Sequence, residues 1–219
     1  MPYSALKTVY AIALIGVMLF FVYLMARITI PYFSFRTDFG FLLTKQAVIG
    51  ISIWKQAFYI HIATGTLVLL SGIAQFIKPI LRRWPKFHRT LGVIYVGLIL
   101  IFTAPSGFVM ALYANGGIWA RISFATTATL WWLFTFLAYK YAREKKFKLH
   151  LANMYRSYAL TLTSISLRLY VLILPHFIHL HSTQMYVLVA WLSWIPNLLI
   201  AEILIRNFKL RGSLIPGRS

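Results

Sequence analysis

Five ionisable residues within or beside long apolar runs have types that could do chemistry: His61, His88, His150, Arg156 and Arg168. An ionisable side chain is costly inside a bilayer, so each is a candidate for a functional role. Two neutral imidazoles that face each other across a four-helix core are the axial ligands that a b-type haem needs. Guanidinium groups would then neutralise the haem propionates. The residue types therefore raise haem b as one hypothesis for a cofactor.

The fifth apolar run carries a polar stripe. At about 100° per residue, five of its side chains fall on one helical face, namely His150, Ser157, Thr161, Ser164 and Arg168. Such a stripe normally faces the interior of a helix bundle or a wet cavity, and we expect it to line an internal chamber. The alternative is that Ser and Thr form hydrogen bonds between helices while the arginines extend to lipid headgroups.

The histidines also differ in predicted depth. His88 and His150 lie near the cytoplasmic ends of the third and fifth runs, whereas His61 lies toward the outside. Three more histidines follow the fifth run in an outer connection (His176, His179 and His181). The distribution allows one candidate pair on each side of the membrane. The alternative is that these histidines are ordinary residues of the membrane interface.

Acidic residues are scarce, because the chain has 3 Asp and Glu against 22 Lys and Arg. We therefore expect Arg89, Arg156 and Arg168 to lack protein carboxylates and to attract an anionic guest: a propionate, a lipid phosphate or a carboxylate substrate. The chain has no cysteine, which excludes a zinc finger, an iron–sulfur cluster and a thiol nucleophile. It also has no glycine-rich phosphate loop, catalytic triad or HExxH pattern.

Long apolar runs must position these residues. The sequence is 60% hydrophobic and 11% charged, against about 25% charged residues in soluble domains. Six runs reach the roughly 20 residues that a helix needs to cross a bilayer, and none alternates as a barrel strand would. We predict an all-α integral membrane six-helix bundle, a single transmembrane domain over residues 1–219, whose second to fifth spans form a four-helix core. The expected spans are Thr8–Ile30, Gln56–Leu81, Leu91–Tyr113, Ile118–Tyr141, Leu151–Pro175 and Gln184–Ile205.

The basic residues predict the orientation. Fifteen of the 22 Lys and Arg residues fall on one side of the six runs, and the positive-inside rule makes that side, with both termini, cytoplasmic. We expect a multi-pass protein of the inner (cytoplasmic) membrane. The net charge of +19 sits in short clusters between the runs, which indicates contact with an anionic inner leaflet and not with nucleic acid. We expect Pro31–Lys55 to lie along the outer interface and Pro105 to kink the third span.

A set of spaced motifs resembles a known family. It is a family of bacterial multi-span membrane proteins catalogued as a domain of unknown function, and the resemblance covers roughly residues 57–175. The resemblance implies a helical membrane fold and marks the same five residues as the site, but it implies no activity. A looser, architectural similarity is to bis-histidine cytochrome b membrane proteins. The motifs are His61 with Gly65 and Gln75-Phe76, then Arg82, His88-Arg89-x-x-Gly92-x-x-Tyr95, Gly116-Gly117, and His150-x-x-x-Met154-x-Arg156-Ser157 with Arg168.

Three functions remain open at this point. The first is haem-b- and quinone-linked electron transfer, with His61, His88 and His150 as candidate iron ligands and Arg156 and Arg168 beside the propionates. The second is a non-catalytic accessory or assembly subunit of a larger membrane complex. The third is a carrier of a small anion or a lipid. The sequence does not decide whether the protein is an enzyme.

Overall fold

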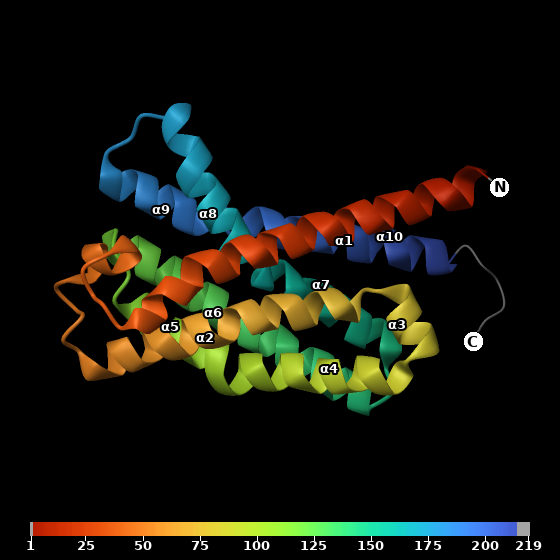
Figure 1. The fold of residues 1–219 in the computed structure, drawn as a ribbon. Helices are drawn as coiled ribbons and strands as arrows, with labels where there is room; N and C mark the ends of the chain where they lie inside the picture. The colour runs from red at the N-terminus through yellow and green to blue at the C-terminus, as the bar shows by residue number, and fades with distance from the viewer. Residues whose placement is uncertain (1, 214–219) are drawn as a thin grey trace. The chain divides into compact units, whose positions relative to one another are not determined.

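The computed structural model describes residues 2–213, and these residues form helices and connecting turns without a strand (Figure 1). Six of the helices are long and apolar enough to cross a membrane, which confirms the predicted fold class. They cover Ile12–Ser34, Ser52–Gln75, Pro85–Leu112, Gly117–Arg143, Phe147–His176 and Ser182–Asn207.

The second span is shorter at its C-terminal end than predicted. Helix α2 (Ser52–Gln75) ends before residue 81, and Lys78–Arg83 form a separate short helix, α3. Pro79 explains the break, because a proline at this position has no N–H for the carbonyl of Gln75, four residues earlier.

The chain divides into two compact units, Met1–Leu98 and Ile99–Ser219. The N-terminal unit contains α1 (Pro2–Thr29), α2, α3 and α4 (Pro85–Gly97). In this unit α1 packs against α2, and α2 packs against α4. Trp54, Val68 and Leu69 of α2 and Tyr95 of α4 are almost completely buried, so the unit has its own apolar core.

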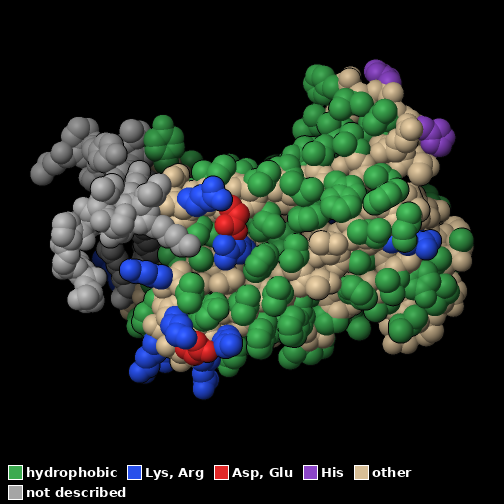
Figure 2. Space-filling model, turned by 180° about the vertical axis from the view of Figure 1, so that it is seen from behind, with side chains coloured by type: hydrophobic (Ala, Val, Ile, Leu, Met, Phe, Trp, Pro, Cys, Tyr) green, Lys and Arg blue, Asp and Glu red, His purple; other side chains and the backbone are tan. Residues whose placement is uncertain are grey.

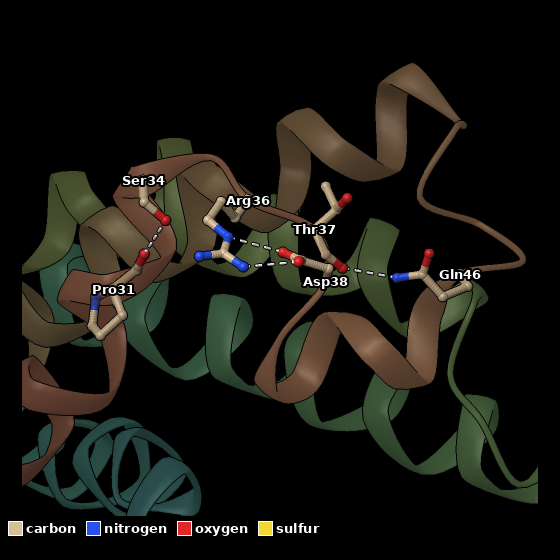
Figure 3. A network of polar contacts seen from close by, with 6 residues as sticks. All are labelled: Pro31, Ser34, Arg36, Thr37, Asp38 and Gln46. Atoms are coloured by element: carbon tan, nitrogen blue, oxygen red, sulfur yellow. Dashed lines mark hydrogen bonds and ion pairs between the residues drawn. The ribbon is translucent and has the colours of Figure 1, made fainter.

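The outer connection of the N-terminal unit contains two short 3₁₀ helices, Ile30–Ser34 and Gly40–Lys45. Figure 3 shows the polar contacts that shape it: Arg36 pairs with Asp38 at 2.9 Å, and Gln46 Nε2 donates to the carbonyl of Thr37 at 2.8 Å. The hydrogen bond from Arg36 holds the pKa of Asp38 below its usual value. These contacts give the connection a defined shape although it has no long helix.

An aromatic cluster attaches this connection to the start of α2. The Tyr32 ring stacks on Phe39 at a centroid distance of 4.9 Å and meets Phe58 edge-on at 5.4 Å. Trp54 stacks on Phe58 at 5.6 Å and is fully buried. Aromatic pairs at these distances contribute beyond their buried area, so the cluster fixes the connection to the helix.

The C-terminal unit contains the rest of the third span and the last three spans. Its helices are α5 (Ala104–Leu112), α6 (Gly117–Arg143), α7 (Phe147–Thr161), α8 (Thr163–Ile173), α9 (Ser182–Leu192) and α10 (Ile195–Ser213). Helix α6 is central, since α5, α7 and α9 all pack against it, while α10 packs against α7. The sixth span therefore joins the packed core of this unit.

The third span is irregular just before Pro105, the residue at which we predicted a kink. Residues Leu98–Thr103 form a π-helical turn. In a π-helix the carbonyl of Leu100 would accept from the residue five positions later, which is Pro105 and has no N–H. The indole N–H of Trp132, from α6, donates to this carbonyl instead at 3.2 Å.

Large apolar side chains remain on the outside of the molecule. The face in Figure 2 is mostly hydrophobic, with Lys and Arg in small groups. Exposed examples lie on several spans, such as Leu67, Ile101, Leu172 and Ile203. Exposed apolar surface on helices of this length is what a lipid environment requires.

Candidate functional site

Three hydrogen bonds join α6 to α7 along the polar stripe that the sequence predicted. His150 Nδ1 bonds to the carbonyl of Ala138 at 2.9 Å, and the hydroxyls of Ser157 and Thr135 lie 2.7 Å apart. The third bond runs from the indole N–H of Trp131 to Thr161 Oγ1 at 3.1 Å. We call this set of contacts the α6–α7 seam.

The small side chains of the seam bring the two helices close together. Ala138, Thr135 and Ser157 are completely buried, and Thr161 is almost so. Small and hydroxylated residues are typical of helix interfaces in membranes, because they permit close approach and hydrogen-bond across the gap. Along α7 from Ser157 to Thr161 the stripe therefore faces another helix and lines no chamber within this unit.

The His150 ring has a defined tautomer in the seam. A backbone carbonyl can only accept, so Nδ1 must carry the hydrogen that bonds to Ala138. In the neutral ring the lone pair is then on Nε2. His150 is half-buried, three residues after the start of α7. This arrangement suits a metal ligand, since an Nδ1–H bond to a carbonyl is the usual orienting contact of a ligating histidine.

Arg156 has a carboxylate partner, contrary to our expectation. Its guanidinium makes two hydrogen bonds to Glu202 of α10, one of them from Nη2 to Oε2 at 3.0 Å. The guanidinium also lies over the ring of Phe134, 5.5 Å from its centroid. The bidentate pair joins the fifth span to the sixth. It leaves Arg156 poorly suited to hold a propionate or a free anion.

Glu202 is a site residue that the sequence analysis missed. We expected Arg156 to lack a carboxylate because acids are scarce, yet Glu202 falls inside the predicted sixth span and Arg156 inside the fifth. Two opposite charges within spans are each costly when alone, which is a reason to expect that they pair. That signal was present in the sequence.

Arg168 has different surroundings from Arg156. It lies on α8, beyond a break in the span at Leu162, and its Nη1 donates to the carbonyl of Ser164 at 2.8 Å. Ser164 Oγ in turn donates to the carbonyl of Thr161. Arg168 is twelve residues from Arg156, on the order of 18 Å along a helix. The two arginines therefore do not form one cationic site.

The sixth span contributes a second polar network that the sequence analysis did not single out. Trp194 Nε1 donates to Ser123 Oγ at 3.0 Å, and Ser123 donates to the carbonyl of Ala190 at 2.9 Å. The amide of Asn197 donates to Ser166 Oγ and to the carbonyl of Ala159. Spans four, five and six are thus joined by hydrogen bonds between side chains and backbone. Single polar residues in apolar runs gave no pattern from which to predict these pairs.

His61 and His88 lie in the N-terminal unit and at different depths. A methyl group at Gly92 of α4 would lie 3.2 Å from Gln75 Oε1 of α2, so these residues are level with each other. His61 is fourteen residues before Gln75, roughly 21 Å along α2, and His88 is four residues before Gly92 on α4. Because α4 follows α2 through a tight corner and runs back along it, the two histidines lie toward opposite ends of this unit.

The C-terminal unit has a hollow on its surface. A shallow hollow of about 330 Å³ lies on the outside of α6 and is lined by Ile122, Ala125, Thr126, Thr129 and Leu130. None of these residues belongs to the α6–α7 seam. Among the described residues there is also no cluster of three or more His, Asp or Glu that would hold a metal ion.

The fold and these contacts define an all-helical, multi-span membrane protein whose last three spans are joined by polar contacts. Residues 58–205 match the family model described as "Predicted membrane protein (DUF2306)". The chain belongs to this family of membrane proteins, which confirms the resemblance noted in the sequence. Neither a comparison with curated proteins nor one with solved structures finds a match.

Proposed function

We propose that this membrane protein holds a b-type haem for one-electron transfer and that His150 is one of its axial ligands. The observation that carries the proposal is the hydrogen bond from His150 Nδ1 to the carbonyl of Ala138, which leaves Nε2 with the lone pair that iron binds. Bound haem would supply a one-electron redox centre, with a quinone as a suitable electron partner in the membrane.

Haem requires an axial ligand and cations beside its propionates, and the residues near His150 fit the first requirement better than the second. The imidazole has the tautomer that an axial ligand needs. Arg156 does not fit the role of propionate partner, because Glu202 occupies its guanidinium. Exposed cations at the same end of the helices, Arg143 and Lys148, fit that role better. Arg168, at the far end of the fifth span, does not belong to a site at His150.

Absorption spectra test the proposal. The protein is expressed with added haem precursor, purified in mild detergent, and measured oxidised and after dithionite reduction. We expect a Soret band and a sharpened α band on reduction. The variant H150N should lose both bands, since Asn keeps a donor near the Nδ1 position but has no group at Nε2.

The control variant is H179A, which alters an exposed histidine of the outer connection. It should keep the spectrum of the unaltered protein. The proposal is rejected if the unaltered protein shows no Soret band after haem reconstitution, or if H150N keeps the full spectrum.

A second candidate function is that of a non-catalytic subunit of a larger membrane complex. It is favoured by the polar groups of the last three spans, which satisfy one another, and by the shallow hollow on the outside of α6. Extraction in a gentle detergent should then recover a stoichiometric partner. A protein that is monodisperse and without a partner would count against this function.

A further inference from the structure

The corner between α3 and α4 has the composition of a lipid-binding surface. Arg83, Trp84, Pro85, Lys86 and Phe87 line a hollow of about 360 Å³. The corner joins the ends of two spans, so it lies at the border of the bilayer, on the side that the basic residues predict to be cytoplasmic. We call these five residues, together with Arg89, the α3–α4 corner.

The cations of this corner have no acidic partners. Arg83, Lys86 and Arg89 are exposed, and none of them forms an ion pair among the described residues. The only acid of the N-terminal unit is Asp38, which pairs with Arg36 in the outer connection. Three like charges within seven residues are favourable only if an anion lies near them.

The backbone adds to this positive potential. Helix α4 begins at Pro85, and no side chain caps its first turn. The free N–H groups of a helix start carry partial positive charge. Lys86 and Arg89 belong to the first two turns of α4, so this partial charge lies close to two of the basic residues.

The apolar wall of the hollow distinguishes a lipid from a small anion. Trp84 is 62% exposed and Phe87 49% exposed, which is unfavourable in water but typical of side chains at the level of lipid headgroups. An acyl chain and glycerol would cover these rings while the phosphate meets the cations. A free phosphate would leave the rings uncovered.

We propose that the α3–α4 corner is a binding site for the headgroup of an anionic phospholipid of the inner leaflet. This proposal does not depend on haem binding by His150. The other predicted cytoplasmic loop offers a contrast: Lys146 pairs with Glu144 at 2.8 Å and Lys140 lies 4.0 Å from the same carboxylate. That loop therefore neutralises part of its own charge.

Native mass spectrometry of the full chain tests the site. The protein is purified in detergent, mixed with phosphatidylglycerol or phosphatidylcholine, and scored for retained lipid. We expect retention of phosphatidylglycerol and little of phosphatidylcholine. The triple variant R83Q/K86Q/R89Q should bind phosphatidylglycerol more weakly by at least about tenfold, because each basic side chain near an anionic lipid contributes several-fold.

The matched control is K140Q/K145Q/K146Q, which removes the same charge from the end of α6 and the α6–α7 loop. It should retain the lipid like the unaltered protein. A further variant, W84A/F87A, keeps every charge and should weaken retention, because it removes the apolar wall. Equal losses in the two charge variants would overturn the proposal in favour of unspecific attraction. Displacement of the lipid by inorganic phosphate at equal concentration would overturn the role of the acyl chain.

Discussion

The two halves of the fifth span, α7 and α8, each carry an arginine and several hydroxyl side chains, but these residues have different surroundings. In α7 the polar residues are buried against neighbouring helices: Ser157 is 0% exposed and bonded to Thr135, and Arg156 is paired with Glu202. In α8 the apolar residues Val171 and Leu172 face outward, and the Arg168 guanidinium bonds to a carbonyl of its own helix. Arg156 therefore joins α7 directly to α10, whereas α8 is joined to α10 through Ser166 and Asn197.

This comparison changes what we infer from the polar stripe of the fifth span. A single helical face from residue 150 to residue 168 suggested one chamber lined by cations. The break at Leu162 divides the stripe into two parts. The part on α7 packs against α6 and α10, and the part on α8 ends in Arg168. A polar stripe along a span therefore does not by itself indicate a chamber. Breaks in the helix and the hydrogen-bond partners of the polar residues must be considered first.

The largest expected effect comes from the charged pair in α7. Replacing Arg156 by Gln removes the bidentate partner of Glu202 inside the membrane region. We expect the free energy of unfolding in detergent to fall by about 2 kcal/mol, between the values of exposed and buried pairs. Thermal unfolding followed by circular dichroism measures this. R168Q is the control in α8 and should change stability by less than about 0.5 kcal/mol; equal effects of the two variants would contradict the comparison.

Overpacking of the α6–α7 seam should have the next largest effect. Ser157→Leu adds bulk at a fully buried position, and such changes cost about 1–3 kcal/mol because neighbouring helices must move apart. Val171→Leu adds one methylene at an exposed position of α8 and should be nearly neutral. Unfolding in a denaturing detergent provides the measurement. A tolerated S157L variant would mean that α7 does not pack closely on α6.

A smaller effect is expected for the indole at the end of the seam. Trp131→Phe removes the hydrogen bond to Thr161 but keeps most of the apolar volume, and bonds of this kind in membrane proteins contribute about 0.6 kcal/mol. Thr161→Val removes the same bond from the other side. The double variant should be no less stable than the worse single variant. Additive losses would show that the two side chains act separately.

The smallest effect concerns an exposed loop outside the spans. The hydrogen bond from Lys146 holds the pKa of Glu144 below its ordinary value. A lowered pKa in the folded state means that the contribution to stability is present above the unfolded pKa and is lost as the pH falls through the folded value. E144Q should therefore lower the melting temperature slightly at neutral pH and not in acid. A difference that persists in acid would contradict this cause.

The general architecture was predictable because apolar length and basic-residue distribution are properties of composition. Six spans follow from runs of about 20 apolar residues, whatever their neighbours. The irregular turn before Pro105 was predictable for a similar reason, since a missing N–H is a local property. The contacts among Trp194, Ser123 and Asn197 were not, because they depend on which faces of distant helices meet.

The candidate site was predictable only in part. The sequence placed His150, Ser157 and Thr161 on one face of a helix, and the structure places that face against α6. It did not predict the partner of Arg156, because we considered how few acids the chain has and did not look for opposite charges in different spans. Glu202 is 46 residues from Arg156 and meets it only through the packing of α10 on α7.

A double-mutant cycle on Arg156 and Glu202 tests most directly whether α7, the first half of the fifth span, is joined to α10 by a charged pair. The unfolding free energies of R156Q, E202Q and R156Q/E202Q are compared with that of the unaltered protein in the same detergent. We expect a coupling energy of about 2 kcal/mol, so that the double variant is much more stable than the sum of the single losses implies. Additive losses, with a coupling near zero, would mean that the two charges do not meet in the folded protein.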